Sequence, residues 1–131
     1  MTTINAIANR IGLRAEAVMV DNNPNMPDFE GDHWKVTLRR NGPRRSMTVP
    51  FSQGYAISRE PDGKEVLSCL LSDAISIQGC DFEDWCCELG FDSDSRKAHR
   101  SYKATERQSA KLRRFLGEDL YEVLMEDGFQ A

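Results

Sequence analysis

The side chains best suited to nucleophilic or acid–base chemistry in this chain are its two histidines, His33 and His99. His33 opens an expected strand beside Trp34, and His99 lies one position away from the apolar seam of an expected helix. Nucleophilic catalysis requires a serine or cysteine within reach of such a base, and neither histidine stands in a motif of that kind. The sequence also lacks the motifs of metalloproteases, phosphate-binding loops and dinucleotide-binding folds. We therefore predict a surface or interface role for both histidines and no catalytic residues.

Carboxylates and cysteines are the other groups that could form a reactive or metal-binding site. Adjacent acids such as Glu83 and Asp84 point to different sides of a helix, so we interpret them as charges that favour a helix start. The four cysteines are Cys69, Cys80, Cys86 and Cys87. The last two are adjacent and the sequence has no Cys-X-X-Cys pair, which argues against a zinc site. We expect buried, reduced thiols, and we predict no metal, no cofactor and no enzymatic activity.

The elements that must position any functional surface begin with a small antiparallel sheet. Residues 33–39 and 46–51 alternate between apolar and polar side chains, the period of two that half-buried strands show. Asn41, Gly42 and Pro43 between them are typical turn residues, so we expect a hairpin. Residues 13–20 are expected to add a third strand, and the alanine-rich stretch before them could equally be helical.

Helical patterns dominate the C-terminal half. A helix that starts near Asp62 would bury a nearly continuous apolar stripe. This stripe comprises Val66, Leu67, Leu70, Leu71 and Ala74. A short helix over residues 81–89 has Asp81 as its expected cap and Gly90 at its end. Its apolar positions are Phe82, Trp85, Cys86 and Leu89.

A basic helix is predicted from about Asp94 to Leu116, and a short acidic helix follows Gly117. The basic helix has a narrow seam that must pack against the rest of the protein. This seam comprises Ala98, Tyr102, Thr105, Ser109, Leu112 and Leu116. The fold class is therefore α+β, with a three-stranded antiparallel sheet packed on about four helices. We expect a single domain over residues 1–131, with the sheet in residues 1–58 and the helices in residues 59–131.

Charge is distributed unevenly along a chain whose net charge is −4. The basic positions of the hairpin are Lys35, Arg39, Arg40, Arg44 and Arg45. In the basic helix, Glu106 is the single acid between Arg96 and Arg114. Acids gather in the segments on either side, residues 81–94 and 118–127. The basic face is either a binding surface for phosphates or an acidic protein, or a solvated face that neighbouring acids neutralise.

The candidate partner-binding residues follow from the first of these interpretations. They are Trp34, Arg39, Arg40, Arg44, Arg45, Arg96, Arg100, Arg107 and Arg114. Arginine is enriched at binding hot spots and can form bidentate hydrogen bonds. The rival contact surface is acidic and comprises Glu118, Asp119 and Glu122.

The first residues do not resemble a signal peptide, and no apolar run is long enough for a membrane span. We therefore expect a cytoplasmic protein.

Several segments resemble a group of small phage and prophage proteins without an assigned role. They are DFEDWCCELGFDSDSRKA at 81–98, KLRRFLG at 111–117, NPNMP at 23–27, HWKVTL at 33–38 and VPFS at 49–52. The resemblance covers most of the chain, but its motifs are caps, turns and core aromatics. It implies an accessory protein of a mobile element in the cytoplasm of a bacterial host, and anti-CRISPR proteins are the first class it suggests.

Three hypotheses for the function remain open at this point. The leading one is a counter-defence protein that inhibits a host defence protein or ribonucleoprotein complex, such as a CRISPR effector, by stoichiometric protein binding. The alternative is a nucleic-acid-binding accessory factor of phage replication or transcription, which predicts strong salt dependence. A small hydrolase or transferase is the third, and it would require an apolar pocket with a perturbed titratable group. The oligomeric state does not follow from the sequence.

Overall fold

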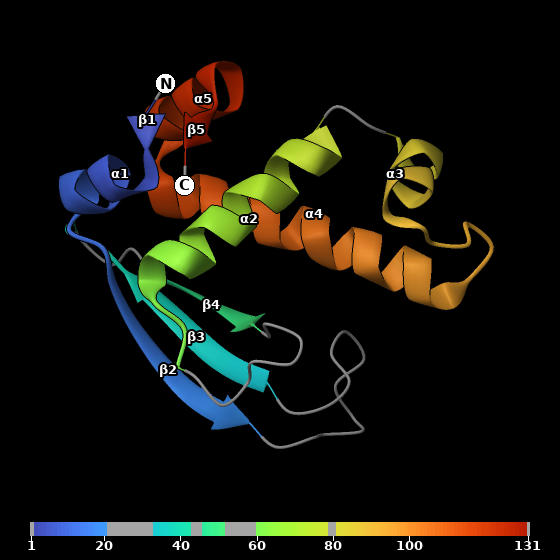
Figure 1. Ribbon diagram of the computed structural model, residues 1–131, viewed down its shortest axis with the longest axis horizontal. Coiled ribbons are helices and arrows are strands. Elements are labelled where there is room, and N and C mark those ends of the chain that lie inside the picture. The colour runs from blue at the N-terminus through green and yellow to red at the C-terminus, as the bar shows by residue number, and fades with distance from the viewer. Residues whose placement is uncertain (1, 21–32, 43–45, 52–59, 79–80, 131) are drawn as a thin grey trace.

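A computed structural model describes residues 2–20, 33–42, 46–51, 60–78 and 81–130 (Figure 1). Along the chain its elements are β1 (Thr2–Thr3), α1 (Ile4–Ile11), β2 (Arg14–Val20), β3 (His33–Arg39), β4 (Ser46–Phe51), α2 (Gly63–Gln78), α3 (Phe82–Leu89), α4 (Arg96–Leu116), α5 (Glu118–Asp127) and β5 (Phe129–Gln130). The predicted α+β class is confirmed, with the sheet in the N-terminal half and most helices in the C-terminal half.

The predicted three-stranded antiparallel sheet is present, with strand order β2-β3-β4. In its register Ala17 pairs with Val36, and Val36 pairs with Val49 on the other side. Val36 and Val49 are buried, whereas Lys35 and Arg39, which alternate with the buried positions, are exposed. The sheet therefore has one apolar face that is covered and one polar face that carries exposed side chains, as the period of two predicts.

The stretch before the first long strand is a helix, the option that the sequence left open. Thr3 caps α1 by accepting a hydrogen bond from the amide of Ala6 at 3.1 Å. Gly12 ends α1 with φ 65°, and a Cβ atom at this position would collide with the side-chain amide group of Asn41. The backbone amide of Asn41 donates to the carbonyl of Ile11 at 2.8 Å. These contacts join the end of α1 to the end of β3.

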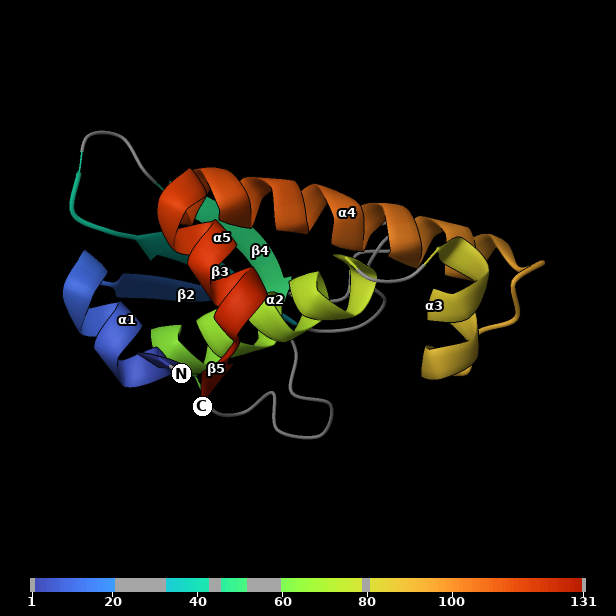
Figure 2. The same cartoon turned by 90° about the horizontal axis from the view of Figure 1, so that it is seen from above.

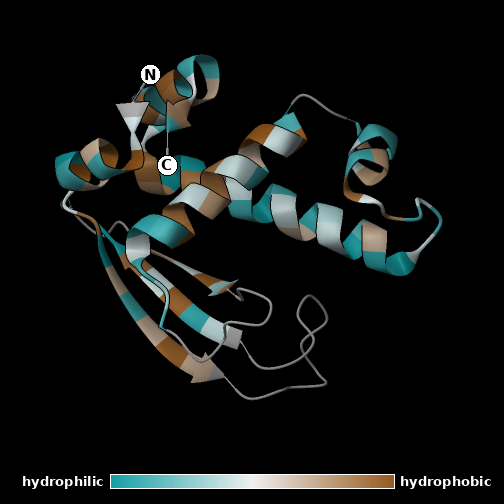
Figure 3. Ribbon diagram, viewed as in Figure 1, coloured by the Kyte–Doolittle hydropathy of each residue, from teal (hydrophilic) through white to brown (hydrophobic). Residues whose placement is uncertain are grey.

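One continuous core fixes α4 against the sheet. The main apolar cluster includes buried residues from α1, α2, α4, α5 and the covered face of the sheet. The predicted stripe of α2 is buried, and so are Ala98, Leu112 and Leu116 of the predicted α4 seam, with Phe115 as an additional buried position. The other seam residues, Tyr102, Thr105 and Ser109, are partly buried. Hydrophobic colours recur along α2 and at the C-terminal end of α4 beside α1, whereas much of the rest of α4 is hydrophilic (Figure 3). The core thus holds one side of α4 and leaves the other exposed.

A second, smaller cluster joins α3 to the N-terminal half of α4. Trp85, Cys86 and Ala98 are buried there among partly buried aromatic rings. Trp85 stacks on Phe91 at 5.3 Å between ring centroids and meets Tyr102 edge to face at 5.2 Å. Both views place α3 at the far end of α4 from α1 and α5 (Figures 1 and 2). The C-terminal end of α4 is therefore held by the main core, and its N-terminal end by α3.

The predicted helix caps are confirmed in detail. Asp62 accepts a hydrogen bond from the amide of Lys64 at 3.1 Å, and Asp81 accepts one from Asp84 at 2.9 Å. Ser95 accepts from the amide of Ala98 at 3.0 Å, so it caps the basic helix, whose start was expected at about Asp94. Gly90 has φ 76°, the left-handed conformation expected at the end of α3.

Three predicted buried positions are exposed. Leu89 is 52% exposed although it shares a face of α3 with Trp85, because the small cluster on α4 covers that face around Trp85 and does not extend to Leu89. Cys69 and Cys87 are exposed free thiols, whereas Cys86 is buried as predicted, and Cys80 lies outside the described residues.

The strands β1 and β5 were not predicted. They form a short parallel pair, with Thr2 opposite Phe129, that brings the two ends of the described chain together.

Candidate functional site

The basic helix α4 is held at both ends by side chains from outside it. Ser95 caps its N-terminus, and the guanidinium of Arg40 reaches the last carbonyl groups at its C-terminus. Nη1 of Arg40 donates to the carbonyl oxygen of Phe115 at 3.1 Å and to that of Leu116 at 2.7 Å. Helix C-termini leave carbonyls without intrahelical partners and favour positive charge. Arg40, a predicted partner-binding residue, therefore has a structural role in the fold.

Six cations form a continuous row on the exposed side of α4, which we call the basic stripe. They are Arg96, Arg100, Lys103, Arg107, Lys111 and Arg114. Their spacings of three and four residues place them on one face of the helix. All are exposed, and the buried seam lies on the opposite face. Over these residues the helix rises about 27 Å, so the stripe is an extended positive surface on a rigid element.

The acidic helices α3 and α5 both meet α4 along a single flank. His99 stacks on Phe82 of α3 at 4.3 Å between ring centroids. At the other end of α4, Arg113 contacts Glu118 of α5 and lies 4.0 Å from Glu122. His99 and Arg113 are separated by fourteen residues, so they lie on the same line along the helix, about 100° from Arg100 and Arg114. Arg113, which carries these ion pairs, is outside the basic stripe.

The hydrogen bond with Glu118 raises the pKa of Arg113, with further support from the charge of Glu118 and of Glu122. The guanidinium of Arg113 also lies 5.7 Å from the ring centre of Tyr121. Glu118 and Glu122, two members of the rival acidic surface, are thus engaged in contacts with α4. Asp119 is exposed and lines a separate hollow with Arg10 and Arg40. The acidic surface is therefore broken up by basic side chains.

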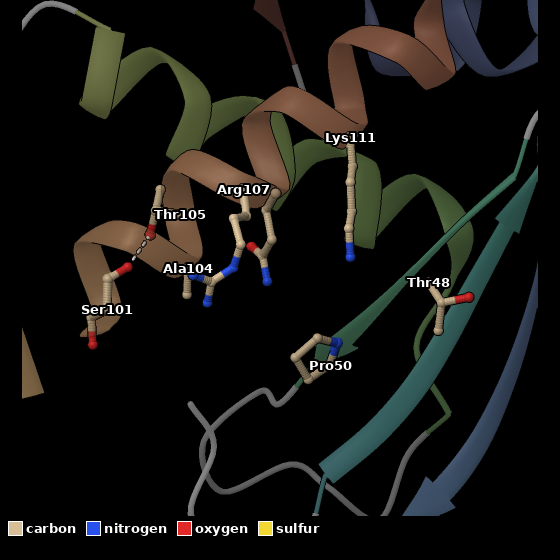
Figure 4. Close-up of a pocket in the computed structure, with 8 residues that line it drawn as sticks. Thr48, Pro50, Ser101, Ala104, Thr105, Arg107 and Lys111 are labelled. Carbon is tan, nitrogen blue, oxygen red and sulfur yellow. Dashed lines mark hydrogen bonds between the residues drawn. The ribbon is translucent and has the colours of Figure 1, made fainter. Parts of the chain in front are cut away.

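A cleft of about 270 Å³ separates α4 from β4 on the other flank. The described residues that line it are Thr48, Pro50, Ser101, Ala104, Thr105, Arg107, Gln108 and Lys111. Arg107 and Lys111 extend from α4 toward the space in front of β4 (Figure 4). No carboxylate is present among these described lining residues. The cleft is therefore a positively charged recess beside the basic stripe, with hydroxyl, amide and small apolar groups on its walls.

Two hydroxyl groups of the cleft already have partners within the protein. Oγ1 of Thr105 donates to the carbonyl oxygen of Ser101 at 2.9 Å. Oγ1 of Thr48 shares a hydrogen bond of 3.0 Å with that of Thr37 on the neighbouring strand. This second bond fixes the Thr48 side chain on the polar face of the sheet. The polar face and the cleft are therefore continuous at β4.

The predicted hairpin residues do not gather at one place. Arg39 is exposed on the polar face of the sheet, 3.8 Å from Glu16 on β2. Trp34 belongs to the opposite face, where it is partly buried against the main core. Arg44 and Arg45 lie outside the described residues. The structure thus brings together the four predicted arginines of α4, Arg96, Arg100, Arg107 and Arg114, whereas Trp34 packs against the core and Arg40 binds the carbonyls at the end of α4.

The cleft was missed by reasoning from the sequence. Its α4 side includes Ser101, Gln108 and Lys111, and its other side is β4, which is more than fifty positions away in sequence. The available signal was the presence of polar residues, Ser101 and Gln108, beside the apolar seam at a spacing of seven. Polar groups at the border of a seam indicate a helix edge that meets solvent or a ligand.

The thiols of Cys69 and Cys86 have pKa values shifted away from reactivity. Burial raises the pKa of the Cys86 thiol, and the pKa of Cys69 is raised by desolvation and by Asp73 and Glu65. Raised values disfavour the thiolate, the reactive form of cysteine. No group of three or more histidine, cysteine and acidic side chains that could hold a metal occurs among the described residues. Within the same residues, no helix is long and apolar enough to cross a membrane.

Comparisons of the chain with protein-family models, curated proteins and solved structures found no match.

Proposed function

We propose that this protein is a phage counter-defence factor that inhibits a host defence complex by binding to it stoichiometrically through the basic stripe of α4. The observation that supports this proposal is the separation of charge around α4. Six exposed cations form one row, and the acidic helices contact the helix on a different flank. The class of target, a defence ribonucleoprotein such as a CRISPR effector, rests on the resemblance of the sequence to small phage proteins.

Preorganisation makes α4 a suitable binding element. Both ends of the helix are capped and one side of it is anchored by Ala98, Leu112 and Leu116 in the interior, so little backbone order must be gained when a partner binds. A row of cations steers an anionic partner toward the helix and increases the association rate. Arginine adds bidentate hydrogen bonds to carboxylates or phosphates. Inhibition by a preformed surface proceeds by occlusion of the target and requires no catalytic group.

Charge reversal tests this assignment. The variant Arg96→Glu, Arg100→Glu, Arg107→Glu is expected to reduce capture of the defence complex at least about tenfold, since reversal replaces attraction by repulsion at three contacts. Capture is measured by co-purification from bacteria that carry an active CRISPR effector, and inhibition by the return of phage plating on those cells. The wild-type complex is expected to contain the protein in a fixed molar ratio.

The matched control alters the rival surface. Neutralisation in the variant Glu118→Gln, Asp119→Asn, Glu122→Gln changes the same number of charged residues on α5, where two of them contact Arg113. Capture is expected to stay within about twofold of wild type, because these acids lie outside the stripe. If this control loses capture and the reversed stripe retains it, the acidic surface is the contact and the proposal is wrong.

A second candidate function is a nucleic-acid-binding accessory factor of phage replication or transcription. It is favoured by the absence of carboxylates among the described residues that line the cleft beside the stripe. This candidate uses the same helix but requires no defence complex. It predicts that phage plating on cells with an active effector does not change when the protein is expressed.

A further inference from the structure

We infer that the cleft between α4 and β4 binds the sugar–phosphate backbone of a single nucleic acid strand. The inference rests on the proposed function, because the same helix faces the partner. It names the chemistry of the part that enters the cleft, namely a strand carried by the defence ribonucleoprotein.

The two cations of the cleft match successive anionic groups on one chain. Arg107 and Lys111 are one helical turn apart, which places them about 5 to 6 Å from each other along α4. Both extend toward the space in front of β4 (Figure 4). A polymer with a regular anionic group can contact both cations at once. Successive phosphates of one strand have this property.

The walls of the cleft suit a sugar–phosphate backbone. Ser101 and Gln108 offer a hydroxyl and an amide on the α4 side, and both are partly exposed. Pro50 and Ala104 provide small apolar surfaces on opposite sides, against which a sugar ring can pack. The described lining contains no aromatic side chain on which a base could stack. Stacking supplies much of the affinity of single-strand binders, so we expect electrostatic, sequence-tolerant binding.

The position of β4 favours a single strand over a duplex. A helix that enters the major groove, about 12 Å wide, must be accessible on both flanks. The cleft flank of α4 is bordered by β4, and its other flank by α3 and α5. The recess of about 270 Å³ lies just below the volumes of about 300 to 1,000 Å³ that small-ligand pockets have, a size that suits one strand better than two.

Fluorescence anisotropy with a labelled oligothymidine of about twelve nucleotides tests the inference, since single-strand sites cover about 4 to 16 nucleotides. The logarithm of the affinity is expected to fall linearly with the logarithm of the salt concentration, by about 0.7 for each phosphate contacted. The variant Arg107→Ala, Lys111→Ala is expected to bind about tenfold more weakly at low salt and to flatten the slope by about 1.4.

The control variant Arg10→Ala, Lys64→Ala removes two exposed cations, one arginine and one lysine as in the cleft variant, that lie outside both the cleft and the basic stripe. Its affinity is expected to stay within about threefold of wild type, since it retains the cleft contacts. Equal losses in the two double variants, or no binding at low salt, would overturn the inference. Thermal unfolding of both variants shows whether each remains folded, which is expected because all four side chains are exposed.

Three competing ligands identify the source of the anion. A duplex of the same length and a thymidine mononucleotide are both expected to compete weakly, and equal competition by either would contradict a strand that runs along the cleft. Polyaspartate tests an acidic protein surface, and its preferential binding would show that the cleft binds an acidic protein and not a nucleic acid.

The two proposals can fail separately. If the reversed stripe loses capture of the defence complex while oligothymidine never binds, the proposed function stands and this inference fails. If oligothymidine binds but the reversed stripe captures the defence complex as well as the wild-type protein does, the proposed function fails.

Discussion

Replacement of Leu112 by alanine is expected to lower the free energy of unfolding by about 3 to 5 kcal/mol. Leu112 is fully buried in the main core, where the seam of α4 meets α2 and the sheet. Its truncation removes apolar contacts and leaves a cavity that close-packed neighbours only partly fill. Domains of this size have a total stability of about 5 to 15 kcal/mol, so the variant is expected to be close to unfolding under mild denaturant.

Urea denaturation followed by circular dichroism measures this effect, and Leu89→Ala is the matched control. The chemical change is the same, but Leu89 is 52% exposed on α3, so its loss is expected to cost less than about 0.5 kcal/mol. A shift in midpoint with an unchanged slope would indicate a change in stability alone. Similar midpoints for the two variants would contradict the packing of α4 described above.

Arg40→Ala is expected to destabilise the protein by about 2 to 3 kcal/mol, the loss of charge-assisted hydrogen bonds that join the hairpin to the end of α4. The guanidinium donates to the carbonyl oxygens of Phe115 and Leu116. Without it, these carbonyls lose their partner and the helix C-terminus loses a favourable charge. Arg40→Lys keeps the charge but not the planar donors, so we expect an intermediate loss.

The neighbouring arginine provides the control for this prediction. Arg39 has the same chemistry, but its ion pair with Glu16 is 3.8 Å long and exposed, so Arg39→Ala is expected to cost less than about 1 kcal/mol. Chemical denaturation of the three variants gives the comparison. Equal stabilities of Arg39→Ala and Arg40→Ala would show that Arg40 does not anchor α4 and would return it to the candidate binding residues.

The parts of the fold that follow from local rules could be predicted from the sequence. Alternation of apolar residues in 33–39 and 46–51 identified the hairpin, and helical spacing identified the stripe of α2 and the seam of α4. The caps Asp62 and Asp81 could be predicted for the same reason, since a cap acts within three residues of its own position. The four arginines of α4 were predicted as one group because a helix places such spacings on one face.

Features that depend on distant segments could not be predicted. Arg40 and Leu116 are separated by 76 positions, and no local pattern distinguishes Arg40 as a helix cap from Arg39 as a surface residue. The cleft is formed only when β4 packs beside α4, so Thr48 and Gln108 carry no joint signal in the sequence. The exposure of Leu89 has the same origin, because helical spacing shows which residues share a face but not how much of that face a neighbour covers.

The central claim is that the basic stripe is the surface in contact with the target, and lysine footprinting of the purified complex with the defence effector tests it most directly. Lys103 and Lys111 lie on the stripe, whereas Lys64 is exposed on α2, away from it. Binding is expected to protect Lys103 and Lys111 from acetylation and to leave Lys64 as reactive as in the free protein. Protection of Lys64 with unchanged reactivity of Lys103 and Lys111 would contradict the account.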